Sequence, residues 1–296
     1  MNGSEGGRKI VGQKVIDRYN HYVHGGMERR DFMERLAQFA GGSGAALALL
    51  PLLQNNPAEA QIIPDNDNRL VISRAEYAAG ATRISGYLAR PKGDEKRPAV
   101  IVIHENRGLN PHIEDVARRM AIEGFLAFAP DMLSPLGGTP PDESKAAQMI
   151  GTLDAEETVT RLAAAVPFLA AHAGSSGKVG VVGFCWGGGM ANRLAAAGTS
   201  LAAGVSYYGR QLPPEDVPKI SAPLLLHYGS LDERINAGIP AYEAALKANR
   251  KTYEIHMYEG ANHAFNNNTS AARYHKQAAD LAWKRTVAFL KKYLSP

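Results

Sequence analysis

Residues Gly183-Phe184-Cys185-Trp186-Gly187 carry the pattern G-x-C-x-G. An apolar run precedes them at 179–182, and a helix-like stretch follows at 188–196. A strand, a sharp turn and a helix are the setting in which this pattern presents a nucleophile at the carboxyl end of a sheet strand. Glycines on both sides allow the backbone to approach a strained turn closely. We therefore predict that Cys185, the one cysteine of the chain, is a nucleophile. The alternative is a small buried apolar residue between glycines.

Two polar residues follow Cys185, each just after a predicted strand. Asp232 comes after the buried run at 222–229, and His263 comes after the alternating run at 251–258. In α/β-hydrolases the nucleophile is followed by an acid and then by a histidine, each on a loop after a later strand. We predict a triad in which His263 takes the thiol proton and Asp232 orients the imidazole. The alternatives are a turn-forming aspartate and a loop histidine bonded to the backbone.

An earlier strand end supplies further candidates. The apolar run at 98–103 is followed by His104-Glu105-Asn106-Arg107. Acyl transfer needs two backbone N–H groups directed at the developing oxyanion, and we assign them to Trp186 and Asn106. The zinc motif H-E-x-x-H is not completed here, because position 108 is glycine. The sequence displays no Cys/His cluster either, so we predict no metal and no cofactor.

From residue 66 onward the chain resembles the dienelactone hydrolase family. The matching residues are Glu105-Asn106, 183–188, Tyr207-Tyr208-Gly209, the Asp232 loop and 260–265. This resemblance implies an α/β-hydrolase fold and the opening of a lactone or ester. It also implies that Glu105 contacts the resting thiol and helps to deprotonate it when substrate arrives. The alternative is a surface carboxylate paired with Arg107.

The sequence departs from the family where the substrate is recognised. Dienelactone-opening members carry an arginine four residues after the histidine, and this chain has Asn267 there. The region 132–145 contains no arginine that could replace a second one. Arg107, Tyr208 and Arg210 are the remaining candidates for substrate binding. The resemblance therefore extends to the chemistry and not to dienelactone as the substrate.

Strand and helix patterns alternate after residue 60, which predicts one α/β-hydrolase domain at 61–296. The expected architecture is a mainly parallel central sheet with helices on both faces. The predicted strands are 70–73, 83–89, 98–103, 125–129, 178–184, 203–207, 222–229 and 251–258. The predicted helices are 113–123, 154–171, 241–248 and 271–293. The Pro- and Gly-rich stretch 132–142 is expected to be a loop over the site.

Residues 1–60 form a separate N-terminal extension. Glu28-Arg29-Arg30-Asp31-Phe32-Met33 resembles a twin-arginine export signature, followed by an apolar run at 36–53 and an A-x-A cleavage site at 58–60. We predict export to the periplasm, with the twin-arginine machinery as partner. The run is short and broken by glycines, so no permanent membrane span is expected. The alternative is a cytoplasmic protein in which 30–50 is an amphipathic helical arm on the domain or on a second subunit.

Composition agrees with an enzyme acting on small molecules. The 296 residues are 45% hydrophobic and 21% charged, with a formal net charge of +4. A basic stripe with interleaved aromatic residues is absent from the sequence, which argues against a nucleic-acid partner. The predicted function is hydrolysis of lactones or small carboxylic esters through a thioacyl-enzyme. A broader esterase, an acyl transferase, or a thiol sensor or binding protein without turnover are the alternatives.

Overall fold

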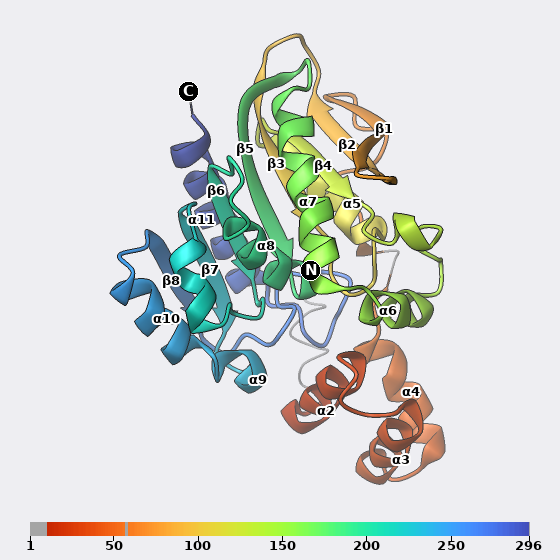
Figure 1. Cartoon of the computed structure of the whole chain (residues 1–296). Helices are drawn as coiled ribbons and strands as arrows, with labels where there is room; N and C mark the ends of the chain where they lie inside the picture. Colours follow the sequence, from red (N-terminus) through yellow and green to blue (C-terminus); the bar gives the residue numbers. More distant parts are fainter. Residues whose placement is uncertain (1–10, 57–58, 296) are drawn as a thin grey trace.

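An eight-stranded sheet forms the centre of the molecule, in the order β1-β2-β4-β3-β5-β6-β7-β8 (Figure 1). The computed structural model describes residues 11–56 and 59–295. The strands are β1 (Leu70–Ala79), β2 (Thr82–Pro91), β3 (Arg97–Ile103), β4 (Leu126–Pro130), β5 (Ser175–Phe184), β6 (Ala203–Tyr207), β7 (Leu224–Gly229) and β8 (Tyr253–Tyr258). β2 pairs antiparallel with β1 and β4, and every other neighbouring pair is parallel. The predicted mainly parallel sheet is confirmed.

Helices cover both faces of the sheet, because its strands are apolar on both sides. The helices of this domain are α5 (Pro111–Ile122), α6 (Glu143–Gly151), α7 (Ala155–Ala170), α8 (Trp186–Ala195), α9 (Glu233–Asn236), α10 (Ile239–Ala248) and α11 (Lys276–Leu294), with 3-10 turns η2 (Ser134–Leu136) and η3 (Pro214–Lys219). In β3, Val100 and Val102 pack in the core layer that contains α5 and α11. The alternate residues Ile101 and Ile103 pack in the layer that contains α7, α8 and α10.

Several elements differ from the sequence prediction. β1 continues to Ala79 and not only to 73, β5 begins at Ser175 and not at 178, and the short helix α9 was not predicted. α6 was not predicted; it begins after Asp142, whose carboxylate accepts hydrogen bonds from the amides of Ser144 and Lys145. Its buried face holds Ala146 and Ile150, too few apolar residues to show a helical period in the sequence. α11 begins at Lys276 and not at 271, because 271–274 form turns before the helix cap at His275.

The described part of the N-terminal extension folds into three helices. They are α2 (Gln13–Val23), α3 (Arg29–Ala40) and α4 (Ser43–Leu53), and they share a small core that also includes Ala272 of the domain. The predicted arm at 30–50 is interrupted at Gly41, which adopts φ 81°, so α3 and α4 are two helices bent by 110°. Residues 1–10 and Ala58 of the predicted cleavage motif lie outside the described residues.

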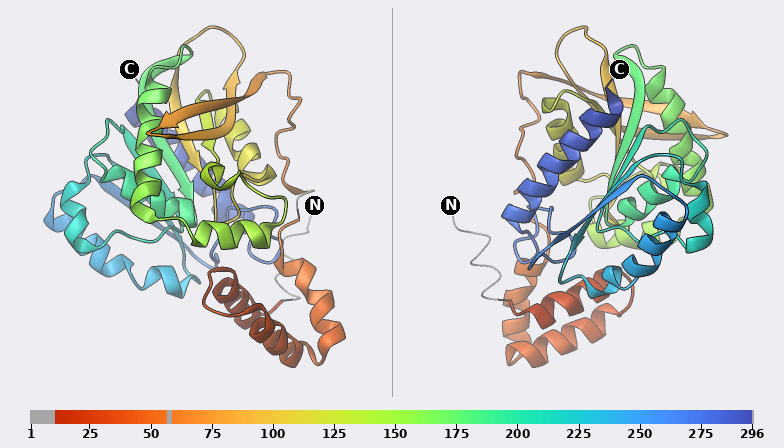
Figure 2. Two further views of the ribbon diagram at one scale, coloured as in Figure 1. Left: turned by 45° about the vertical axis from the view of Figure 1, so that its right-hand side comes forward. Right: turned by 90° about the vertical axis from the view of Figure 1, so that its left-hand side faces the viewer.

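These three helices lie beside the carboxyl ends of the parallel strands (Figures 1 and 2). Over the described ranges, no single helix has the length and apolar character needed to cross a membrane. Within the described part of the chain, α3 and α4 taken together, with the bend between them, are the one pair that reaches that length and composition. The N-terminal helices are therefore placed beside the loops that carry the candidate site residues.

Candidate active site

Cys185 lies at the sharp turn between β5 and α8. Its backbone adopts φ 55° and ψ −113°, a conformation that is costly for a residue with a side chain. A Cβ atom on Gly183 would overlap the Gly187 carbonyl, and one on Gly187 would overlap the carbonyls at the end of β3. Glycine is therefore required on both sides of the turn. The side chain of Cys185 is buried at 7% exposure, at the start of α8, which is the place that the G-x-C-x-G pattern predicts.

Asp232 and His263 meet at the same edge of the sheet. Asp232 follows β7 and His263 follows β8, and His263 Nδ1 lies 2.5 Å from Asp232 Oδ2. Burial disfavours a charged ring at His263, but the negative charge of Asp232, together with that of Cys185 when it is a thiolate, outweighs burial and raises the pKa of His263 to about 9. Burial would raise the pKa of Asp232, but the charge of His263 lowers it overall. The Nε2 atom of His263 is buried and has no hydrogen-bond partner among the described residues.

Glu105 lies after β3 and is buried, with both carboxylate oxygens engaged. Oε1 accepts a hydrogen bond from the Tyr208 hydroxyl at 3.3 Å, and Oε2 accepts one from Asn267 Nδ2 at 2.8 Å. Asn267 stands where the resemblance places a substrate-binding arginine. In this chain it holds Glu105 instead. The alternative pairing of Glu105 with Arg107 is not what the structure shows, because Arg107 Nη1 donates to the Glu143 carbonyl at 3.0 Å.

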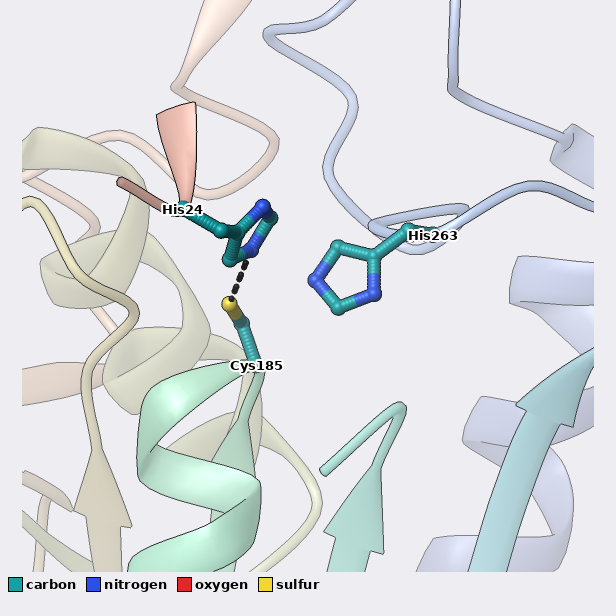
Figure 3. A group of neighbouring side chains, drawn as sticks. All are labelled: His24, Cys185 and His263. Carbon is teal, nitrogen blue, oxygen red and sulfur yellow. Dashed lines mark hydrogen bonds between the residues drawn. The ribbon is translucent and has the colours of Figure 1, made fainter. Parts of the chain in front are cut away.

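The sulfur of Cys185 is bonded to a residue that the sequence analysis missed. His24, just past the end of α2, places its Nε2 atom 3.2 Å from Cys185 Sγ (Figure 3). The rings of His24 and His263 meet edge to face, with centroids 4.7 Å apart and planes at 88°. Local sequence around His24 contains no motif that could have indicated this position. The contact arises from the packing of the N-terminal helices on the domain.

The candidate oxyanion residues flank the same site. Trp186 is the first residue of α8, and its ring stacks on His104 with centroids 5.2 Å apart. His104 is a buried structural residue: its Nδ1 donates to the Glu105 carbonyl at 2.7 Å, and its Nε2 accepts from the Met132 amide at 3.2 Å. The Asn106 side chain donates to the Val23 carbonyl at 2.8 Å and so also joins the site to the N-terminal helices.

A cavity of about 470 Å³ opens onto Cys185. Its walls come from the end of α2, from α6, from α8 and from the loops after β6 and β7. Tyr208 and Arg210, both predicted for substrate binding, line this cavity together with Arg193 and Arg234, which were not predicted. Arg107 lines a smaller neighbouring hollow that also reaches Cys185 and His263. The cavity therefore combines one thiol, two imidazoles and several guanidinium groups.

Three donor atoms in the site could hold a metal ion. One ligand atom each from His24, Cys185 and His263 lie within 4.8 Å of one another. Thiolate and imidazole are ligands that suit zinc. The sequence-based expectation that the chain has no Cys/His cluster is wrong at this place, because His24 comes from a distant part of the chain. That the protein works without a metal stays a prediction.

Two family models match the chain, and it resembles several known proteins. The model of the dienelactone hydrolase family matches residues 84–294, and a YqhI-like family model matches residues 10–42. An Escherichia coli O157:H7 protein, assigned by name as a carboxymethylenebutenolidase, is 30% identical over 254 residues, which cover 80% of this chain and 93% of the relative. A Bradyrhizobium protein, assigned by name as a 2-oxo-3-(5-oxofuran-2-ylidene)propanoate lactonase, is 35% identical over 231 residues, with 73% of this chain and 91% of the relative covered.

A solved structure shares the fold. The crystal structure of a protein assigned as a dienelactone hydrolase from Klebsiella pneumoniae superposes with a TM-score of 0.69 at 29% identity, and it covers 76% of this chain and 100% of that one. The family match runs from β2 to the end of α11 and includes every predicted site residue of the domain. The sheet is therefore that of an α/β-hydrolase, and the chain belongs to the dienelactone hydrolase family of hydrolases.

Proposed function

We propose that this hydrolase opens lactones or small carboxylic esters through a thioacyl-enzyme on Cys185. The observation that carries the proposal is the Asp232–His263 pair: the His263 ring lines the cavity, and its buried Nε2 atom, within 4.8 Å of the thiol sulfur, has no hydrogen-bond partner among the described residues. An imidazole oriented by a carboxylate is the group that removes a proton from a nucleophile in acyl transfer. The raised pKa of His263, due chiefly to the charge of Asp232, favours transfer of the thiol proton to this ring.

The chemical steps follow from these positions. The sulfur of Cys185 attacks the acyl carbon and its proton passes to His263 Nε2. Backbone N–H groups of Trp186 and Asn106 bind the oxyanion, and the proton on His263 goes to the departing alkoxide. Water, deprotonated by His263, then hydrolyses the thioester and returns the free thiol. Glu105, held by Tyr208 and Asn267, keeps a negative charge near the site that opposes a free thiolate.

The walls of the cavity favour a substrate that carries a carboxylate. Arg193, Arg210 and Arg234 line it, and guanidinium groups bind carboxylates in a bidentate way. The Bradyrhizobium relative is named for a lactone that bears a propanoate group. A lactone with a neighbouring carboxylate is therefore the substrate class that we propose, in line with the arginine-lined walls.

The test compares the full-length protein with three variants on a chromogenic ester and on a dienelactone. Cys185→Ala and His263→Ala are each expected to lower kcat/KM by about 10³-fold or more, because the two residues act as a unit. Cys185→Ser keeps the turn and serves as a control for folding. Mass spectrometry of the quenched reaction should detect an acyl group on the wild-type chain and none on Cys185→Ala.

Three outcomes would contradict the proposal or favour one of its alternatives. Ester hydrolysis that survives Cys185→Ala would remove the nucleophile assignment. A folded wild-type protein whose thiol reacts with alkylating agents, but which turns over neither substrate, would favour a thiol sensor or binding protein. Faster transfer of the acyl group to an added alcohol than to water would identify an acyl transferase.

A further inference from the structure

His24 contacts the sulfur as a hydrogen-bond acceptor. Its Nδ1 atom lies 2.5 Å from the Asn20 carbonyl, and a carbonyl oxygen can only accept, so Nδ1 carries the ring hydrogen. In the neutral ring Nε2 then has a free lone pair, and this atom lies 3.2 Å from Cys185 Sγ. Burial lowers the pKa of His24 well below its usual range, which keeps the ring neutral. The contact is therefore a hydrogen bond from a thiol to an imidazole nitrogen.

The other groups that could take the thiol proton lie close to the sulfur but, among the described residues, make no hydrogen bond of ordinary geometry with it. Both oxygens of Glu105 are engaged by Tyr208 and Asn267, and His263 Nε2 has no partner within the described residues. The titratable groups around the sulfur are His24 at the end of α2, Glu105 after β3, Tyr208 after β6, Asp232 after β7 and His263 after β8. Of these, His24 is the one that holds the sulfur in this structure.

Several contacts from the domain fix His24 in this place. Asn106 donates to the carbonyl of Val23, the residue before it. Arg273 donates to the side chain of Asn20 at 3.4 Å, and its guanidinium lies over the Tyr19 ring at 5.3 Å. At the other end of α2, Gln13 exchanges hydrogen bonds with Asn262, the neighbour of His263. α2 is thus attached to the domain at both ends.

We propose that His24 is a positioning residue that holds Cys185 as a neutral thiol in the free enzyme, with the S–H group directed at His24 Nε2. The proposal rests on the thiol-based mechanism above. A hydrogen bond made by the neutral form of a group favours that form over the charged one. In the attack step the hydrogen bond to His24 is lost, the S–H bond breaks, and the proton moves to His263 Nε2 as the sulfur bonds to the acyl carbon. The N-terminal helices thereby supply a group that favours the neutral form of the nucleophile in the free enzyme.

The rate of alkylation of Cys185 by iodoacetamide tests this directly. The chain has one cysteine, so the mass of the full-length protein reports only this thiol. Rates are measured from pH 5 to pH 9 without substrate. His24→Phe keeps the volume of the ring but removes the acceptor, and His24→Gln keeps an acceptor near the position of Nε2. His21→Phe places the same change at an exposed position on the same helix.

His24→Phe is expected to react about tenfold faster than wild type at pH 7, with its rate profile displaced by about one unit to lower pH. His24→Gln and His21→Phe should follow the wild-type profile. An unchanged profile in His24→Phe would overturn the proposal. So would an equal acceleration at every pH in both His24 variants, because that result means that His24 only covers the sulfur. Alkylation needs no turnover, so these outcomes are independent of whether Cys185→Ala retains esterase activity.

Discussion

Cys185 is held in an unfavourable backbone conformation by the close packing of its neighbours. The strain of such a residue is of the order of 1–3 kcal/mol and persists only where the surroundings enforce it. Here the enforcement comes from Gly183 and Gly187, which allow the turn to lie against the end of β3. Because this requirement is local, G-x-C-x-G between a strand and a helix was sufficient to predict the turn. The strained backbone is what directs the thiol into the cavity.

Gly187→Ala tests this packing, with Gly189→Ala as the matched control two residues later. A Cβ at position 187 would overlap the carbonyls of Ile103 and His104, whereas a Cβ at position 189 would meet Arg210 at 3.6–3.7 Å, an ordinary contact. Gly187→Ala is expected to lower the free energy of unfolding by about 2 kcal/mol. Gly189→Ala, inside α8, should raise it by up to about 1 kcal/mol. Urea denaturation measures both values, and equal stability of the two variants would contradict the argument.

The buried ring of His112 makes the free energy of unfolding depend on pH in the acid range. It is fully buried in α5, and burial lowers its pKa from 6.5 to about 4. Above pH 6.5 the ring is neutral in the folded and unfolded states. Between pH 6.5 and 4 only the unfolded state takes up the proton, so stability is lost as the pH falls through this window. The loss assigned to this residue is about 3 kcal/mol.

The measurement is the free energy of unfolding in urea between pH 7 and pH 4. In His112→Leu the free energy of unfolding should fall by about 3 kcal/mol less over this pH range than in the wild type. Part of the fall in the free energy of unfolding should remain in this variant, because other buried histidines such as His227 also have lowered pKa values. A His112→Leu protein with the wild-type slope would show that the ring is not protonated on unfolding in this range.

At the scale of elements, the strands were the most predictable part. β6 was predicted with its observed bounds, and β3 and β7 within two residues, because buried parallel strands are continuous apolar runs. Asp232 and His263 could be placed for the same reason, since each follows such a run directly. α6 could not be predicted, because its buried face holds two residues, Ala146 and Ile150. The contact of His24 with Cys185 spans 161 residues and depends on how helices pack, which no local pattern encodes.

The loop after β6 is predicted to recognise the charge of the substrate. Arg210 is exposed on this loop and lines the cavity, whereas Arg107 is bonded to the carbonyl of Glu143. Arg210→Ala should raise KM about tenfold for a lactone that carries a carboxylate and leave KM for a neutral ester unchanged, because a hydrogen bond to a charged group is lost. Arg107→Ala is the control and should alter both values equally or not at all. Equal KM changes for both substrates in Arg210→Ala would exclude carboxylate recognition by this residue.

At the scale of the whole molecule, the N-terminal helices are part of the active-site wall. Val23, His24 and Gly25 line the cavity, and Arg273 of the domain donates to Asn20 inside α2 and to Asn55 just after α4. The extension predicted as a separate object at 1–60 therefore contributes groups to the site in its described part. This arrangement connects two proposals that the sequence treats as unrelated, export and control of the thiol.

Export through the twin-arginine pathway remains a proposal, and it makes a specific prediction about the site. Arg29 and Arg30 are exposed at the start of α3, where a receptor can reach them. Cleavage after Ala60 would give an exported chain that starts at residue 61 and lacks His24. The intact masses of the periplasmic and cytoplasmic proteins from a bacterial host, with Arg29→Lys/Arg30→Lys as the export-deficient control, establish where the chain begins. A periplasmic chain from residue 61 should then alkylate at Cys185 with the pH profile of His24→Phe. Full-length protein confined to the cytoplasm in both cases would refute export and leave the segment as a permanent arm that holds the thiol.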